Sequence, residues 1–138
     1  MKILTDLVKE ILINIGDGNA NVLNTSFGAL NVQFYSGTNA LFSTGLQIYS
    51  TGYTGSNAFT QFATDATYAT ATFGTFLTAA VSTAGNVGTF AFLNSFLIEL
   101  VTGNVSTTGG TGDLKFNTTA WGVGDIVSIT ALSFRMPG

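Results

Sequence analysis

The sequence contains no histidine and no cysteine, and it carries only four basic and seven acidic residues among 138. Without histidine, no side chain has an unperturbed pKa near neutrality for acid–base catalysis. Without cysteine, there is no thiolate nucleophile, no thiolate ligand for zinc and no disulfide. The charged fraction is 8%, against about 25% in an average soluble domain. These absences favour a structural protein over an enzyme, and we expect no catalytic site, metal or cofactor.

A membrane span and a nucleic-acid surface are also disfavoured. No apolar run reaches the roughly 18 residues that a transmembrane helix needs. Charges interrupt the first ten residues, which therefore lack the continuous apolar core of a signal peptide. The net charge of −3 does not suit phosphate binding. We expect a protein of the cytoplasm with neither a membrane nor a nucleic acid as partner.

One amphipathic helix is predicted at the start of the chain. Its apolar side chains recur at spacings of three and four, with polar residues between them. They are Leu4, Leu7, Val8, Ile11, Leu12 and Ile15. A helix of about three turns is not stable alone, so this stripe must dock on its own domain or on a neighbour. We treat residues 1–18 as a helical arm, with a partner interface as one role for the stripe, and residues 19–138 as one domain.

The rest of the chain has the texture of β structure. Val, Ile, Thr, Phe and Tyr dominate, and turn signals recur about every ten residues. Strands are expected over 30–34, 46–49, 58–62, 69–77 with a break near Gly74, 89–93, 96–101, 114–117 and 126–134, the last being the longest unbroken one. The pattern predicts an all-β fold, an antiparallel sandwich of the jelly-roll or Greek-key kind, with a short N-terminal α-helix. In 114–117, alternation places Leu114 and Phe116 inward and Lys115 and Asn117 outward.

Few residues protect the edges of such sheets. Lysine and proline usually guard edge strands, and this chain has three lysines and one proline. The hypothesis that this composition favours is that other copies or another protein cover the edges. A solvated Thr/Asn surface is the alternative.

Two acidic turns and one glycine-rich loop resemble ligand sites. Asp113 and Asp125 each follow a glycine and could bind calcium, but aspartates in such turns more often bond nearby backbone N–H groups. Thr108–Gly112 matches no phosphate-binding motif and is better read as a flexible hairpin loop.

The aromatic residues admit two interpretations. A group of them could form a platform that stacks on sugars: Phe34, Tyr35, Tyr49, Tyr53 and Tyr68. A core together with a subunit interface is the plainer interpretation. Trp121, between Ala120 and Gly122, is expected to be exposed and to anchor a partner.

The chain resembles, most closely in its C-terminal third and more loosely before it, a group of small structural proteins of tailed phages that are described as virion-associated. The similarity lies in three segments: Leu30–Gly37, the Gly-rich turn and strand Gly110–Thr119, and Gly124–Phe134 followed by Pro137. Gly88–Leu93 is similar to a further strand of that group but lacks its arginine.

The resemblance implies a phage particle component. We therefore expect a non-enzymatic cement or decoration protein, made in the host cytoplasm and incorporated into the virion. Its expected partners are the major capsid protein or other virion proteins and further copies of itself, for example in a trimer. The alternatives are a tail, baseplate or head–tail connector part, or a carbohydrate-binding module.

Overall fold

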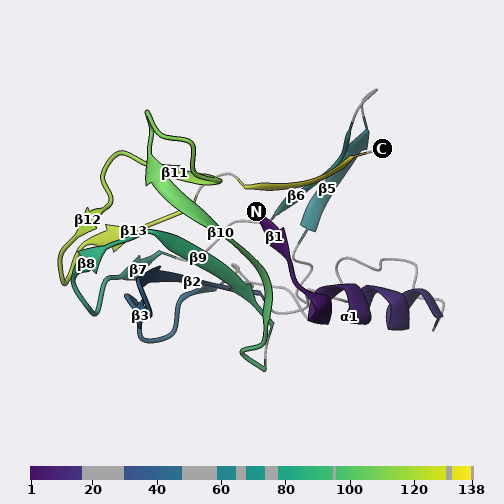
Figure 1. The fold of residues 1–138 in the computed structure, drawn as a ribbon, viewed down its shortest axis with the longest axis horizontal. Coiled ribbons are helices and arrows are strands. Elements are labelled where there is room, and N and C mark those ends of the chain that lie inside the picture. Colours follow the sequence, from purple (N-terminus) through teal and green to yellow (C-terminus); the bar gives the residue numbers. More distant parts are fainter. Residues whose placement is uncertain are drawn as a thin grey trace.

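The computed structural model describes residues 1–16, 30–47, 59–64, 68–73, 78–94, 96–129 and 132–137. These residues form antiparallel β-sheets, one parallel strand pair and one short helix, so the predicted all-β class is confirmed. The helix, α1 (Thr5–Gly16), lies at one side of the molecule, away from the short strands β7, β8, β12 and β13 (Figure 1).

The largest sheet has seven strands and contains most of the core. Its order is β1-β10-β9-β2-β3, with β11 also paired to β10 and β4 to β2. The strands are β1 (Lys2–Ile3), β2 (Asn31–Ser36), β3 (Asn39–Ala40), β4 (Leu46–Gln47), β9 (Thr89–Leu93), β10 (Glu99–Thr107) and β11 (Leu114–Phe116). The predicted strands over 30–34, 89–93 and 114–117 are confirmed, and β9 and β10 pair antiparallel as a hairpin.

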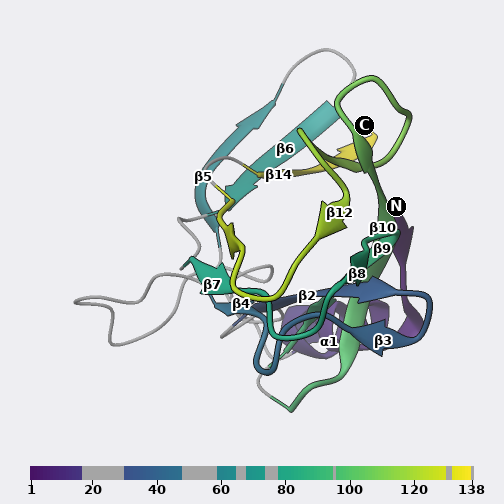
Figure 2. The same cartoon turned by 90° about the vertical axis from the view of Figure 1, so that its left-hand side faces the viewer.

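Two short ladders and a second sheet complete the fold. The ladders are β7 (Ala79–Ala80) with β13 (Ile126–Val127), and β8 (Gly85–Asn86) with β12 (Ala120–Trp121). The second sheet, of order β14-β6-β5, contains β5 (Phe59–Thr64), β6 (Tyr68–Phe73) and β14 (Ser133–Pro137). It lies on the opposite side of the molecule from β2 and β3 (Figures 1 and 2).

The expectation of one long strand over 126–134 is wrong. Ile126–Val127 pairs with β7, whereas Ser133–Pro137 belongs to the second sheet and pairs with β6. The sequence pattern does not show this change of sheet, because apolar alternation is a local signal and does not specify which strand each segment pairs with. The longest strand among the described residues is β10.

The core lies on one face of the main sheet, because alternation along β2 and β10 turns their apolar side chains to the same side. Val32 and Phe34 of β2 and Phe90 and Phe92 of β9 are all at most 1% exposed. Phe116 is partly buried and packs on this cluster, with Leu114 beside it, while Lys115 and Asn117 are exposed. The predicted inward and outward faces of 114–117 are therefore confirmed.

The outer edge of β10 is covered by the protein's own chain. β1 pairs with β10 at Val101 and Thr102, and β11 pairs with it at Val105–Thr107. Between them, the Asn104 N–H donates to Oδ2 of Asp113 at 3.0 Å. For this edge, the hypothesis of cover by other copies or another protein is wrong.

The sequence predicted that Thr108–Gly112 is a hairpin loop. This prediction is wrong, because β11 runs parallel to β10. The chain folds back tightly at Gly112, whose N–H donates to Oγ of Ser106 at 2.9 Å. A Cβ at Gly112 would lie 2.6 Å from the backbone nitrogen of Ser106. Glycine is needed here because no side chain fits between the loop and β10.

Candidate functional site

The connection between β9 and β10 exposes three consecutive large apolar side chains. Phe96 is 83% exposed, Leu97 69% and Ile98 42%. The connection projects from the lower edge of the molecule in Figure 1. We call Phe96, Leu97 and Ile98 the hairpin tip. Single exposed apolar residues are common, but a contiguous group of this kind usually marks an interaction site.

Asn94 holds the hairpin tip in place. Its side chain is buried, and its Oδ1 accepts hydrogen bonds from the N–H groups of Phe96 at 2.9 Å and Ile98 at 3.1 Å. The backbone N–H of Asn94 donates to the Ile98 carbonyl at 3.0 Å, and the Leu97 N–H donates to the Asn94 carbonyl at 3.0 Å. The three apolar side chains are thus displayed by a hydrogen-bonded turn.

Leu97 has a φ of 61°. This left-handed conformation is unfavourable for a branched, bulky side chain, and glycine or asparagine would adopt it at lower cost. The chain instead keeps leucine there, in the middle of an exposed apolar group. Strained backbone of this kind tends to occur at functional sites.

The sequence did not reveal the hairpin tip. The run 96–101 was expected to be a strand, in which alternate residues would be buried. Asn94 was the available signal, because asparagine followed by a short turn often bonds N–H groups two residues on.

The predicted N-terminal stripe is divided between the core and the surface. Leu7 is fully buried in the main core, and Ile11 packs against that core. Val8 and Leu12 are 45% and 64% exposed. Leu4 immediately precedes the helix, and its N–H donates to the Leu100 carbonyl at 2.9 Å. The side chain of Ile15 lies outside the described part of the structure.

Trp121 is buried, so the expectation that it is exposed is wrong. Its exposure is 5%, and its ring makes edge contacts with Phe34 and Phe116, with centroids 5.2 and 5.1 Å away. The indole N–H donates to the Thr118 carbonyl at 2.9 Å. The small neighbours Ala120 and Gly122 suggested an open loop, but Trp121 ends β12 and points into the core.

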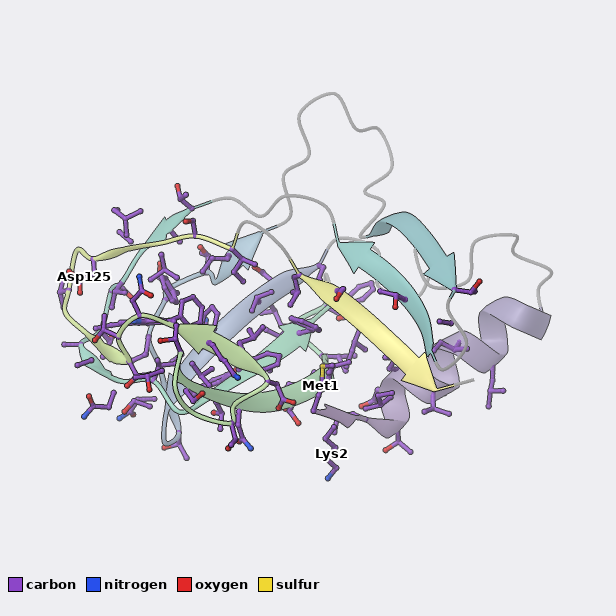
Figure 3. All side chains as sticks on the ribbon, turned by 90° about the horizontal axis from the view of Figure 1, so that it is seen from above. Met1, Lys2 and Asp125 are labelled. Carbon is purple, nitrogen blue, oxygen red and sulfur yellow. The ribbon has the colours of Figure 1, made fainter. Side chains whose placement is uncertain are left out.

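A polar groove crosses the outward face of the main sheet. Its volume is about 590 Å³, and strands β1, β10, β9 and β2 supply most of its walls. The groove is lined by Met1, Lys2, Tyr35, Gly37, Thr38, Thr89, Phe90, Ala91, Glu99, Thr102, Gly103, Asn104 and Asp113. Figure 3 shows the Lys2 side chain projecting away from the ribbon.

Two ionisable groups of the groove have shifted pKa values. The pKa of the Tyr35 hydroxyl is raised, first by burial and then by the negative charge of Glu99. Partial burial alone would raise the pKa of the Asp113 carboxyl. The hydrogen bond and charge of the Met1 amine, 2.8 Å from Oδ1, and the Asn104 N–H outweigh it and hold that pKa below its ordinary value.

The described residues test only part of the sugar-stacking group. Phe34 is fully buried, so it belongs to the core and not to a platform. Tyr35 lines the groove. Tyr68 lies in β6, and Tyr49 and Tyr53 fall outside the described residues.

Asp113 and Asp125, which were considered as calcium ligands, accept backbone N–H groups, the interpretation that the sequence favoured. Asp125, at the opposite end of the molecule from α1 (Figure 3), accepts the Gly122 N–H at 2.8 Å, which fixes its turn. Asp113 bridges the β10 edge. In the described ranges, no group of three or more acidic side chains gathers as a metal site. Within the same ranges, no helix has the length and apolarity needed to span a membrane.

Comparison with known proteins finds no matching family model, no matching curated protein and no matching solved structure.

Proposed function

We propose that this protein is a non-enzymatic structural component of a tailed-phage virion, most simply a cement or decoration protein on the capsid. The observation that carries the proposal is the hairpin tip, in which Phe96, Leu97 and Ile98 are exposed and held by Asn94. The resemblance of 110–119 and 124–134 to virion-associated proteins supplies the biological setting.

An assembly role explains why hydrogen bonds to Asn94 hold the hairpin tip in a defined turn. An anchor that is already ordered loses less conformational entropy on binding than a flexible loop would. Aromatic and aliphatic anchors that fill a pocket contribute most of the binding energy at protein interfaces. Burying side chains of this size gives roughly 1.5–3 kcal/mol each, so three of them are enough to matter in a repeated shell contact.

The partner of the hairpin tip is a protein and not a lipid surface. Anionic membranes attract apolar segments that are flanked by Lys or Arg, whereas the residue next to this tip is Glu99. The major capsid protein is the proposed partner, through an apolar socket with a neutral or basic rim. The exposed Val8 and Leu12 of α1 offer a second contact, to the capsid or to another copy.

The test is to locate the protein in purified particles. Tailed particles from cells that carry the gene are purified, labelled with gold-conjugated antibody against this protein and imaged. Regular labelling over the head supports a cement or decoration role. Labelling confined to the tail or neck supports the tail, baseplate or connector alternative, and particles that contain no copy of the chain contradict the proposal.

A further inference from the structure

The polar groove has the size and position of a small-ligand site. Its volume of about 590 Å³ lies within the roughly 300–1,000 Å³ of typical ligand sites. Most of its lining comes from the face of the main sheet opposite to the aromatic core, and Phe90 of the core also borders it. None of the hairpin-tip residues lines it.

Strand register explains why this face is hollow and polar. Tyr35, Thr89 and Asn104 stand in one cross-strand row, and Ala91, Thr102 and Lys2 stand in the parallel row beside it. Residues of neighbouring rows two positions apart point to the same face. The small Ala91 and the short threonines leave a depression, and the longer side chains form its rim.

The charges that line the groove cancel. The Met1 amine and Lys2 are positive, and Glu99 and Asp113 are negative. The Met1 amine is already paired with Asp113 at 2.8 Å. A charged ligand would therefore meet no net field of the opposite sign, and its desolvation would not be compensated.

The remaining groups suit a ligand rich in hydroxyls. Thr38, Thr89 and Thr102 offer hydroxyls that both donate and accept, Asn104 offers an amide, and Glu99 is an acceptor. Tyr35 adds a ring with a polar end, the kind of side chain that packs on an apolar sugar face while its hydroxyl bonds the ligand. The ordinary pKa of a tyrosine hydroxyl is 10.0 and that of Tyr35 is raised further, so Tyr35 is protonated and can donate at neutral pH.

We propose that this groove binds a neutral saccharide, with Tyr35 packing against the sugar ring and Glu99, Thr89, Thr102 and Asn104 bonding its hydroxyls. The site is independent of the hairpin tip, so it does not depend on the virion proposal. On a phage particle, such a site would give the outer surface a weak affinity for glycans of the host envelope.

The test compares three monosaccharides of different charge. N-acetyl-D-glucosamine, D-glucosamine and D-glucuronic acid are titrated into ¹⁵N-labelled protein up to roughly 10 mM, a range suited to weak binding. The proposal expects saturable shifts with the neutral sugar, concentrated at the amides of Thr89, Thr102 and Asn104, and at least several-fold weaker binding of both charged sugars. The neutral disaccharides maltose, lactose and cellobiose extend the panel in case a single ring is too small.

Variants identify the site. Tyr35→Ala should weaken binding of the neutral sugar at least tenfold and Tyr35→Phe only a few-fold, because the ring is retained. The matched control Val123→Thr, on an exposed turn outside the groove lining, should bind as the wild type does. No binding by any neutral sugar, tightest binding of glucosamine, or unchanged affinity in a folded Tyr35→Ala variant would each overturn the proposal. If Tyr35→Ala does not fold, the amide shifts of the wild type decide the question.

Discussion

The carboxylate of Asp113 occupies the gap that β1 and β11 leave along the edge of β10, where it accepts the N–H of Asn104 at 3.0 Å. Its other oxygen accepts from the Met1 amine at 2.8 Å. One side chain thus completes the cover of an edge that would otherwise offer a free N–H to another strand.

Asp113→Asn should lower stability by about 0.2–1 kcal/mol near neutral pH, the range of exposed ion pairs. The folded-state pKa of Asp113 lies below its ordinary value of 3.8. The stabilisation is therefore fully present above the ordinary value and is lost as the pH falls through the lower, folded-state pKa. Urea unfolding of both proteins across this range should show the difference shrinking in acid. A difference that persists in acid, or an NMR titration that places this pKa at or above 3.8, would contradict the account.

Core packing predicts that alanine substitutions at three positions lower the free energy of unfolding by unequal amounts. Phe34→Ala should cost roughly 3–5 kcal/mol, because the ring is fully buried among Phe42, Phe116 and Trp121. Phe116→Ala should cost about 2 kcal/mol, since its ring is only partly buried. Lys115→Ala should stay under about 0.5 kcal/mol. Denaturant unfolding measures all three, and similar costs at 115 and 116 would mean that the register of β11 is misassigned.

Trp121 provides a spectroscopic check on the core, because it is the only tryptophan. Its indole is 5% exposed and bonds the Thr118 carbonyl. The native protein should therefore emit at short wavelength and resist quenching by iodide, and unfolding should shift the emission to the red. Emission that is already red and readily quenched in the native state would place this residue at the surface.

Buried and exposed positions of α1 should contribute unequally to the stability of the protein. Leu7→Ala should cost roughly 2–5 kcal/mol, because it empties a fully buried site. Leu12→Ser, at a position 64% exposed, should change stability by less than about 0.5 kcal/mol. Melting curves test both. Equal destabilisation by the two variants would show that the helix docks on a different face, and deletion of 1–16 should lower the melting temperature because Leu7 is lost with it.

The fold class and several elements could be predicted from residue patterns, and the reasons differ from one element to the next. The helix and β2 were predictable because their apolar periods of 3.6 and 2 are local signals. The parallel pairing of β11 and the burial of Trp121 were not, because both depend on contacts between segments far apart in the chain. The cover of the β10 edge by Asp113 was missed for the same reason, since Asp113 was read only as a turn residue or a calcium ligand.

The candidate sites were harder to predict than the fold. The hairpin tip reads as a strand in sequence, and only the hydrogen bonds of Asn94 turn Phe96, Leu97 and Ile98 outward. Tyr35 was among the aromatic candidates, but the groove around it arises from the cross-strand register of four strands, which local patterns do not specify.

The proposal that the hairpin tip anchors this protein in an assembly is tested most directly by replacing the three tip side chains without disturbing the fold. The triple variant Phe96→Ser, Leu97→Gly, Ile98→Thr keeps Asn94 and relieves the positive φ of Leu97. The control Val123→Ser, Ile126→Thr removes similar apolar surface from positions that are each 69% exposed, on the turn that holds Asp125. Both should keep the wild-type melting temperature within a few degrees.

The measurement is the number of copies of each protein retained on purified tailed particles, determined by quantitative mass spectrometry. We expect the triple variant to be lost from the particles at least tenfold relative to wild type, while the control variant is retained. A folded triple variant that occupies particles at the wild-type level, or equal loss of both variants, would contradict the claim that the hairpin tip anchors this protein in an assembly.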